Sequence, residues 1–295
     1  MSEAPDVTVN ETLTLTLTVV DNDGATNSDS IVITINPTTP SIQGTITFQR
    51  FGFIDSPLTY LNAVVDFDNP KILPSRQIVV QLKNISDEVL SHTLTDENGH
   101  YMFDMNTGDI GKEYKVTALA QMELDNEIDD GFKILVTDQS TSENKATQTV
   151  YSFDSPELTY TGGQSTQDIY MEAGWLSEQQ TFNADALAQP FAILDTLHKA
   201  TDYFQDNGVV FTDSLEPLYV NWSRDPNILL GNSAYYDPQQ NVFVLDGNLA
   251  KLAPSSDDYL SAPWDYSVIT EWNEVTIIHE FTHYYQKQNI VRDDS

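Results

Sequence analysis

Polar and apolar side chains alternate strictly over residues 12–19, which read Thr-Leu-Thr-Leu-Thr-Leu-Thr-Val. A period of two is typical of a β-strand that buries one face. Turn-forming residues follow at 21–24 (Asp-Asn-Asp-Gly), and the apolar run 31–35 predicts a return strand. The start of the chain is therefore expected to form a β-hairpin, which is marginal in water without further packing. Pro37 and Pro40 then indicate a linker.

Residues 41–160 contain short apolar runs without the 3.6-residue period of an amphipathic helix. The runs are 42–48, 78–82, 101–103, 114–119 and 132–136. An Asp-Glu-Asn-Gly turn at 96–99 predicts a hairpin that includes residues 101–103. Strands of this length and spacing predict a β-sandwich over residues 41–160.

The pattern changes after residue 160, where the stretch 161–165 (Thr-Gly-Gly-Gln-Ser) indicates a domain boundary. Residues 184–205 are expected to be helical because apolar residues repeat at the helical period: Ile193, Leu197, Ala200 and Phe204. Pro190 suits a first turn, and Asn207-Gly208 ends the helix. His198 lies off the apolar stripe and is expected to face solvent or to be lightly packed. Further strands are predicted at 218–220 and 242–245.

A stretch without proline or glycine, residues 271–290, predicts the last helix. Its apolar residues fall on one stripe: Ile277, Phe281 and Tyr284, with Ile278 and Tyr285 beside them. Its polar residues fall on another: Thr276, His279, His283 and Gln286. Such a helix can bury one side and present the other to solvent or to a ligand.

The spacing His279-Glu280-x-x-His283 on this helix points to metal chemistry. Two histidines four residues apart lie one turn apart on one face, so both can reach a single metal ion. Glu280 projects about 100° around the helix from His279, where it can take a proton from a water on that metal and pass it to a leaving amine. A zinc ion would lower the pKa of that water and polarise a substrate carbonyl. The alternative is an amphipathic helix with two incidental histidines.

The charge balance argues against nucleic acid and anionic membranes as partners. With 13 basic and 45 acidic residues, the net charge of −32 repels nucleic acid and anionic membranes. The acidic residues are spread along the chain, and this distribution favours solubility in salty surroundings as their role. The alternative role is calcium binding by a few acidic loops. Asp21 and Asp23 in the hairpin turn are the calcium candidates; the other interpretation is a plain solvated turn.

The absence of cysteine excludes disulfides, thiol catalysis and cysteine-ligated zinc, and it leaves the compartment open. No apolar run approaches the roughly 18 residues of a membrane span, so no span is expected. The first residues have neither the basic nor the apolar region of a signal peptide.

Residues 276–285 resemble the long form of the zincin metallopeptidase signature, in which the positions around the ligands are uncharged. The resemblance implies a zinc metalloendopeptidase that hydrolyses protein or peptide substrates, with His279 and His283 as ligands and Glu280 as general base. Gln286 and Asn289 stand where the metzincin branch needs glycine and histidine, which leaves the gluzincin-like branch with a later glutamate ligand. Because the sequence ends at Ser295, soon after His283, the third ligand is expected further on and the chain is expected to be an incomplete fragment.

The zincin resemblance also implies a substrate-binding strand. In that fold, the strand before the active-site helix lies at the sheet edge and binds extended substrate backbone by strand addition. Val242, Phe243 and Val244 are the candidates, and an ordinary internal strand is the alternative. The order of helix, strands and active-site helix implies the N-terminal part of an α+β catalytic domain over residues 165–295.

Two further resemblances concern the β-rich part. The order Gly44-Thr45-Ile46, then Tyr101-Met102-Phe103, then Tyr114-Lys115-Val116 looks like a carboxypeptidase-regulatory-like (transthyretin-like) β-sandwich over residues 41–160. Residues 1–38 resemble the closing hairpin of a PKD or cadherin-like module, through the Val-x-Asp-x-Asp-Gly turn. The predicted fold class is thus a multidomain chain of all-β sandwich modules followed by an α+β zincin-like domain.

These modules imply a secreted or cell-surface protein of a bacterial type, whose signal peptide lies outside this sequence. The β modules also imply a second possible function, in which the protein is an extracellular adhesion or interaction protein and its C-terminal domain is not catalytic. The metal site separates the two functions, since an inert domain has no reason to keep two histidines and a glutamate in register.

Overall fold

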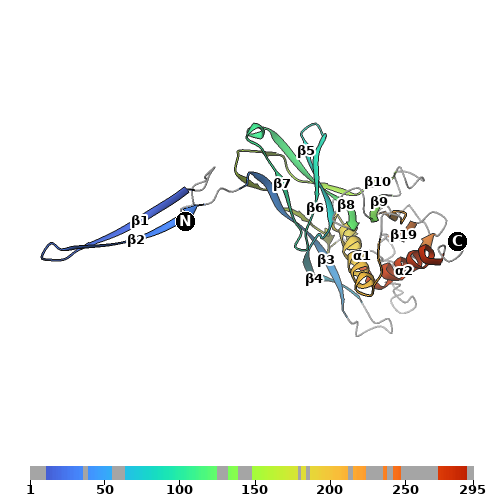
Figure 1. Ribbon diagram of the computed structural model, residues 1–295. Helices are drawn as coiled ribbons and strands as arrows, with labels where there is room; N and C mark the ends of the chain where they lie inside the picture. Colours follow the sequence, from blue (N-terminus) through green and yellow to red (C-terminus); the bar gives the residue numbers. More distant parts are fainter. Residues whose placement is uncertain are drawn as a thin grey trace.

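The computed structural model describes residues 11–35, 39–54, 64–124, 132–138, 148–178, 181–183, 187–211, 215–223, 235–237, 242–246 and 272–290 (Figure 1). Within this part, the chain is mostly β-structure with two long helices, α1 (Ala188–Asp206) and α2 (Glu274–Ile290), and one 3₁₀ turn, η1 (Thr107–Asp109). The β-rich character expected from the alternating and short apolar runs is confirmed.

The N-terminal segment forms the expected hairpin from β1 (Glu11–Val20) and β2 (Thr26–Ile35) in antiparallel register. Leu13 lies opposite Ile33 and Leu15 opposite Ile31, which gathers the apolar side chains on one face. That face was expected to be buried, but Leu13, Leu15 and Leu17 are 48–69% exposed. Figure 1 shows the hairpin extending away from the other elements, so no described residue covers it.

The largest sheet contains seven strands along its main path: β18 (Tyr235–Asp237), β19 (Val242–Asp246), β17 (Leu218–Ser223), β9 (Phe132–Asp138), β8 (Glu113–Leu124), β5 (Ile78–Asn84) and β6 (Val89–Leu94). Three short strands pair with internal strands of this path: β10 (Thr149–Val150) with β9, and β11 (Ser152–Asp154) and β12 (Leu158–Thr159) with β8. Strand β17 is parallel to both β9 and β19, whereas β18 is antiparallel to β19. The sheet therefore continues across the boundary expected near residue 160. The domain division itself stays a prediction.

A second sheet is built around β3 (Ser41–Ile54), which pairs with β4 (Val64–Pro74), β7 (His100–Asp104), β13 (Gln164–Thr166) and β14 (Ile169–Met171). A separate two-stranded ribbon consists of β15 (Trp175–Leu176) and β16 (Thr181–Phe182). The two sheets contribute side chains to one hydrophobic core, which includes Ile46, Val80, Val116 and Ile134, each 0% exposed. This shared core is the β-sandwich character that the sequence predicted for residues 41–160.

Helix α1 packs against strands of both sheets and against α2. Its expected apolar stripe is buried at Ile193, Leu197 and Ala200. His198 was expected to face solvent or to be lightly packed, but it is 2% exposed. It lies between two carboxylates, with Nδ1 2.9 Å from Asp202 and Nε2 3.6 Å from Glu97 of the turn before β7. The polar side of α1 is therefore buried as well as its apolar stripe.

A buried charge cluster joins β3 to α1. Arg50 is 6% exposed and donates to the Ala192 carbonyl (2.8 Å), to Asp195 (3.3 Å) and to Thr196 (2.8 Å). Burial lowers the pKa of Arg50, and the nearby Glu274 and Asp195 carboxylates oppose this shift. Because each buried polar atom needs a partner, this network fixes α1 at one position along β3.

Candidate metal centre

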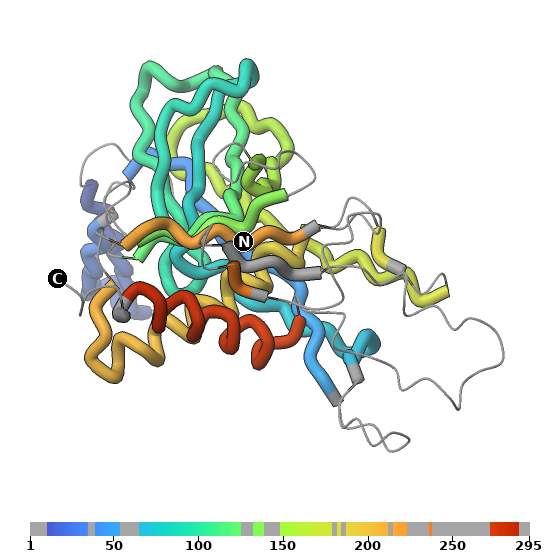
Figure 2. Tube along the Cα trace, turned by 90° about the vertical axis from the view of Figure 1, so that its right-hand side faces the viewer, coloured from blue at the N-terminus to red at the C-terminus, as the bar shows by residue number. Residues whose placement is uncertain are grey.

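Helix α2 is held against the core by its apolar stripe. Ile277, Phe281 and Tyr284 are each 0% exposed, as the sequence pattern predicted. The Phe281 ring lies 5.7 Å from Phe204 of α1, and the Tyr284 ring lies 5.7 Å from Phe132 of β9. The Tyr284 hydroxyl donates to the Glu216 carbonyl at 2.9 Å. Figure 2 shows α2 running alongside the strands of the large sheet. The opposite face of the helix therefore has a fixed orientation.

The two predicted ligands lie together on that opposite face. His279 and His283 are both exposed, their Nε2 atoms are 3.0 Å apart, and their rings are nearly perpendicular with centroids 4.6 Å apart. Zn–N bonds of about 2.0–2.1 Å at a tetrahedral angle place two ligand nitrogens about 3.3–3.4 Å apart. The observed separation is that of a hydrogen bond between the two imidazoles and is slightly shorter than this value, so a small rotation of the rings would let both nitrogens reach one zinc ion.

Glu280 differs from the two histidines because it is buried, at 7% exposed. Carboxylates are rarely this buried without a cation or hydrogen-bond donor. No described residue provides the Glu280 carboxylate with a hydrogen bond or an ion pair. The site therefore places one buried carboxylate next to two exposed imidazoles on α2.

A third ligand is not found in the part of the chain that the structure describes, where no group of three His, Cys, Asp or Glu side chains converges. The described site therefore consists of two imidazoles and one adjacent carboxylate. The glutamate ligand inferred from the zincin resemblance stays a prediction.

The strand predicted to bind substrate is not an edge strand. Val242, Phe243 and Val244 of β19 pair with Asp237, Tyr236 and Tyr235 of β18, so β19 has a neighbour on each side. Among the described residues, the edge of the sheet beside α2 is β18 instead. The prediction that β19 forms the edge of the sheet is wrong because β18 was not recognised in the sequence. It is only three residues long, too short to show an alternation of polar and apolar residues.

Strand β18 lies directly against the candidate metal helix. The Tyr236 ring meets the Tyr284 ring edge-on, with centroids 6.1 Å apart. Burial, together with the charges of Glu216 and Asp237, raises the pKa of Tyr236 to about 12, so its hydroxyl keeps its proton at neutral pH.

The calcium candidates lie in the tight turn of the exposed hairpin. One carboxylate oxygen of Asp21 accepts the backbone N–H groups of Asp23 (3.0 Å) and Ala25 (2.8 Å). This Asx-type turn explains the residue at 21 without a metal ion. Calcium binding at Asp21 and Asp23 stays a prediction.

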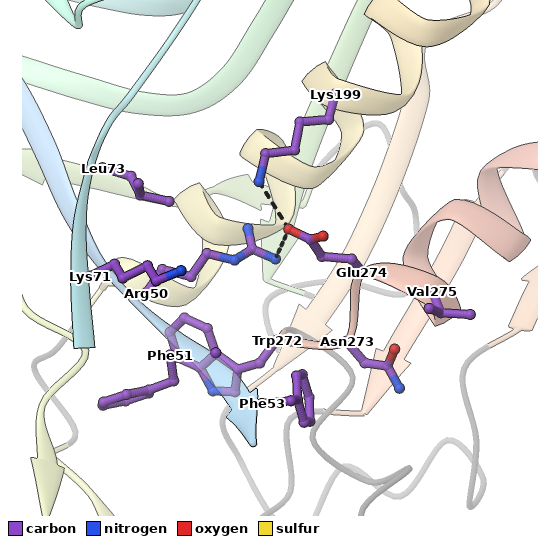
Figure 3. A pocket seen from close by; sticks show the side chains of 11 residues that line it. Arg50, Phe51, Phe53, Lys71, Leu73, Lys199, Trp272, Asn273, Glu274 and Val275 are labelled. Carbon is purple, nitrogen blue, oxygen red and sulfur yellow. Dashed lines mark hydrogen bonds and ion pairs between the residues drawn. The ribbon is translucent and has the colours of Figure 1, made fainter. Parts of the chain in front are cut away.

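The sequence interpretation missed a pocket at the first turn of α2 (Figure 3). It has a volume of about 410 Å³ and lies where β3, β4, α1 and α2 meet. Glu274 of α2 links β3 and α1, since its Oε1 lies 3.2 Å from Arg50 and 2.9 Å from Lys199. The signal in the sequence is the rarity of cations, since it contains only 13 Lys and Arg residues against 45 Asp and Glu residues.

Comparisons with known proteins leave the site to be judged on its geometry. No protein-family model matches the chain, and no curated protein is similar enough to be counted as a relative. Among the described residues, neither helix combines the length and apolar character needed to cross a membrane.

Proposed function

We propose that the protein is a zinc-dependent metallopeptidase that hydrolyses peptide bonds in protein or peptide substrates. The observation that carries this proposal is the pair of Nε2 atoms 3.0 Å apart, adjacent to a buried carboxylate without a partner among the described residues. An incidental pair of surface histidines gives no reason for Glu280 to be buried and unpaired beside it.

The proposed roles follow from position. His279 and His283 hold the zinc ion through their Nε2 atoms, and the ion, when bound, supplies Lewis acidity toward the substrate carbonyl. Glu280 accepts the proton of the attacking water and later donates it to the leaving amine. The β18 edge offers backbone groups to an extended substrate. A third ligand, which the zincin resemblance implies to be a glutamate, belongs to the same proposal.

The first test is proteolysis by the parent protein and by Glu280→Gln. The amide keeps the shape of the side chain but does not accept a proton, so the cleavage rate of an unfolded protein substrate is expected to fall at least about 100-fold. His92→Ala, which changes an exposed histidine on β6, is the control and is expected to cleave normally. Equal cleavage by the parent and Glu280→Gln would contradict the proposal.

A second function is favoured by the exposed hairpin, whose apolar face has no cover in the described part of the chain. Exposed apolar patches commonly mark binding surfaces. If the protein instead acts in extracellular adhesion or interaction through its β modules, binding to its partner is expected to be unchanged in Glu280→Gln. The same binding is expected to be lost when Leu13, Leu15 and Leu17 are replaced by serine. The two functions are therefore separable by these two sets of variants.

A further inference from the structure

The pocket at the first turn of α2 is unusual for such an acidic chain because cations converge on it. Arg50 of β3, Lys71 of β4 and Lys199 of α1 all line it, which is three of the 13 basic residues in the sequence. Figure 3 shows their side chains directed inward from three different elements. Such a local concentration of positive charge within a net charge of −32 favours an anionic ligand.

One of these cations is free to bind a ligand. Arg50 and Lys199 both engage the carboxylate of Glu274, at 3.2 Å and 2.9 Å. Lys71 has no hydrogen-bond or ion-pair partner among the described residues, and it is exposed. The pocket therefore holds one carboxylate already and keeps one further ammonium group available.

Apart from Gly52 and Asn273, the rest of the lining is apolar. Phe51 and Trp272 are 2% and 1% exposed and meet edge-to-face, with ring centroids 5.2 Å apart. Phe53, Leu73 and Val275 complete the apolar part of the wall. A ligand that suits this pocket carries its negative charge on a short apolar stem, as an acidic amino-acid side chain does.

The pocket lies next to the candidate metal centre. Val275 lines it and is 78% exposed, and His279 follows four residues later, one turn along the same face of α2. Four residues of helix advance about 6 Å. An extended peptide covers that distance in about two residues.

We propose that this pocket binds the acidic side chain of a peptide substrate, about two residues from the bond cleaved at the histidine pair. The carboxylate pairs with Lys71 and shares Lys199 with Glu274, and the stem of the side chain lies against Phe51 and Trp272. The assignment to substrate recognition rests on the proposed peptidase function, whereas the binding of an acidic peptide does not require it.

The proposal predicts opposite effects on acidic-peptide binding when Glu274 and Lys71 are replaced. The Glu274 carboxylate pairs with Arg50 and Lys199, which also contact Asp195, so it competes with an incoming acidic group for the same donors. Replacing it by glutamine is expected to strengthen binding, whereas replacing Lys71 by alanine weakens it. Arg50 retains Asp195, Thr196 and the Ala192 carbonyl as partners in Glu274→Gln, which leaves the buried cluster intact.

The test is a pair of end-blocked alanine peptides that differ only by one glutamate or glutamine at a central position. Their binding is followed by NMR through the indole N–H of Trp272, without zinc so that no cleavage occurs. The parent is expected to bind the glutamate peptide about fivefold more tightly than its glutamine twin. Lys71→Ala is expected to lose this preference and Glu274→Gln to increase it.

Lys112→Ala is the matched control, because it removes the same charge from an exposed site outside the pocket. It is expected to keep the parent's preference. Equal binding of the two peptides by the parent, or an equal loss in Lys112→Ala and Lys71→Ala, would overturn the proposal. Because binding is measured without zinc, a failed cleavage test with Glu280→Gln would remove the peptidase function and leave this result standing.

Discussion

At the scale of single residues, the candidate site depends on opposite exposures at adjacent positions. The sequence predicted the face that carries His279 and His283, because helical spacing fixes directions around the axis. It did not predict the burial of Glu280, since that depends on which elements pack beside α2. Nor did it predict the 3.0 Å separation of the two Nε2 atoms, which depends on rotamers.

Asp195 gives a prediction for pH dependence. Burial acts to raise its pKa, but the hydrogen bond from Arg76 and the charge of Lys199 outweigh burial and hold the pKa below its ordinary value of 3.8. A carboxyl with a lowered folded pKa stabilises the fold above its unfolded pKa, and this stability is lost as the pH falls through the folded pKa. Asp195→Asn is therefore expected to lower the free energy of unfolding at pH 7.

The difference between the parent and Asp195→Asn is expected to shrink below about pH 4, where the carboxyl begins to be protonated. Urea unfolding across a pH series measures both values. Asp202→Asn is a useful comparison, since Asp202 is about half-exposed and pairs with His198 outside this cluster. A difference between parent and Asp195→Asn that does not change with pH would contradict the proposed ion-pair network.

At the scale of elements, local patterns predicted both helices and about half of the described strands, but not the pairing between distant strands. The parallel alignment of β17 with β9 joins residues more than eighty positions apart, and no local pattern encodes it. The same limit explains the wrong edge strand: β18 has three residues, too few for alternation to be recognised. The domain boundary expected near residue 160 was placed on glycines, while the large sheet continues past it.

Gly44 tests the packing of β3 between β13 and β14. A Cβ at Gly44 would overlap the carbonyl oxygen of Gln167, which lies in the connection between those two strands. Gly44→Ala is expected to destabilise the protein by about 1–3 kcal/mol through overpacking. Gly52→Ala, on the same strand, meets nothing within 4 Å and is expected to be nearly neutral. Thermal unfolding of the two variants compares them, and similar melting temperatures would contradict this packing.

The attachment of α2 to the core gives a second prediction at this scale. Phe281 is 0% exposed and packs against Phe204 and Phe211, so Phe281→Ala is expected to cost about 3–5 kcal/mol. Val275→Ala on the exposed face is expected to change the free energy of unfolding by less than about 0.5 kcal/mol. Denaturant unfolding measures both. A small effect at Phe281 would mean that α2 is not part of the folded core.

At the scale of the whole molecule, charge is the dominant feature. A net charge of −32 destabilises the compact state through self-repulsion, which dissolved salt screens. The melting temperature is therefore expected to rise between about 20 mM and about 200 mM NaCl. Calorimetric scans at constant pH measure this shift. A falling melting temperature would indicate that favourable ion pairs such as those of Asp195 outweigh the repulsion.

The most direct test of the central claim is a zinc titration by isothermal calorimetry on the parent chain, on His283→Ala and on the surface control His92→Ala. Two imidazoles on one helical face are expected to bind zinc in the parent and in the control, and His283→Ala is expected to lose most of that affinity because one ligand is gone. No binding in the parent, or equal binding in the parent and His283→Ala, would contradict a metal centre on α2.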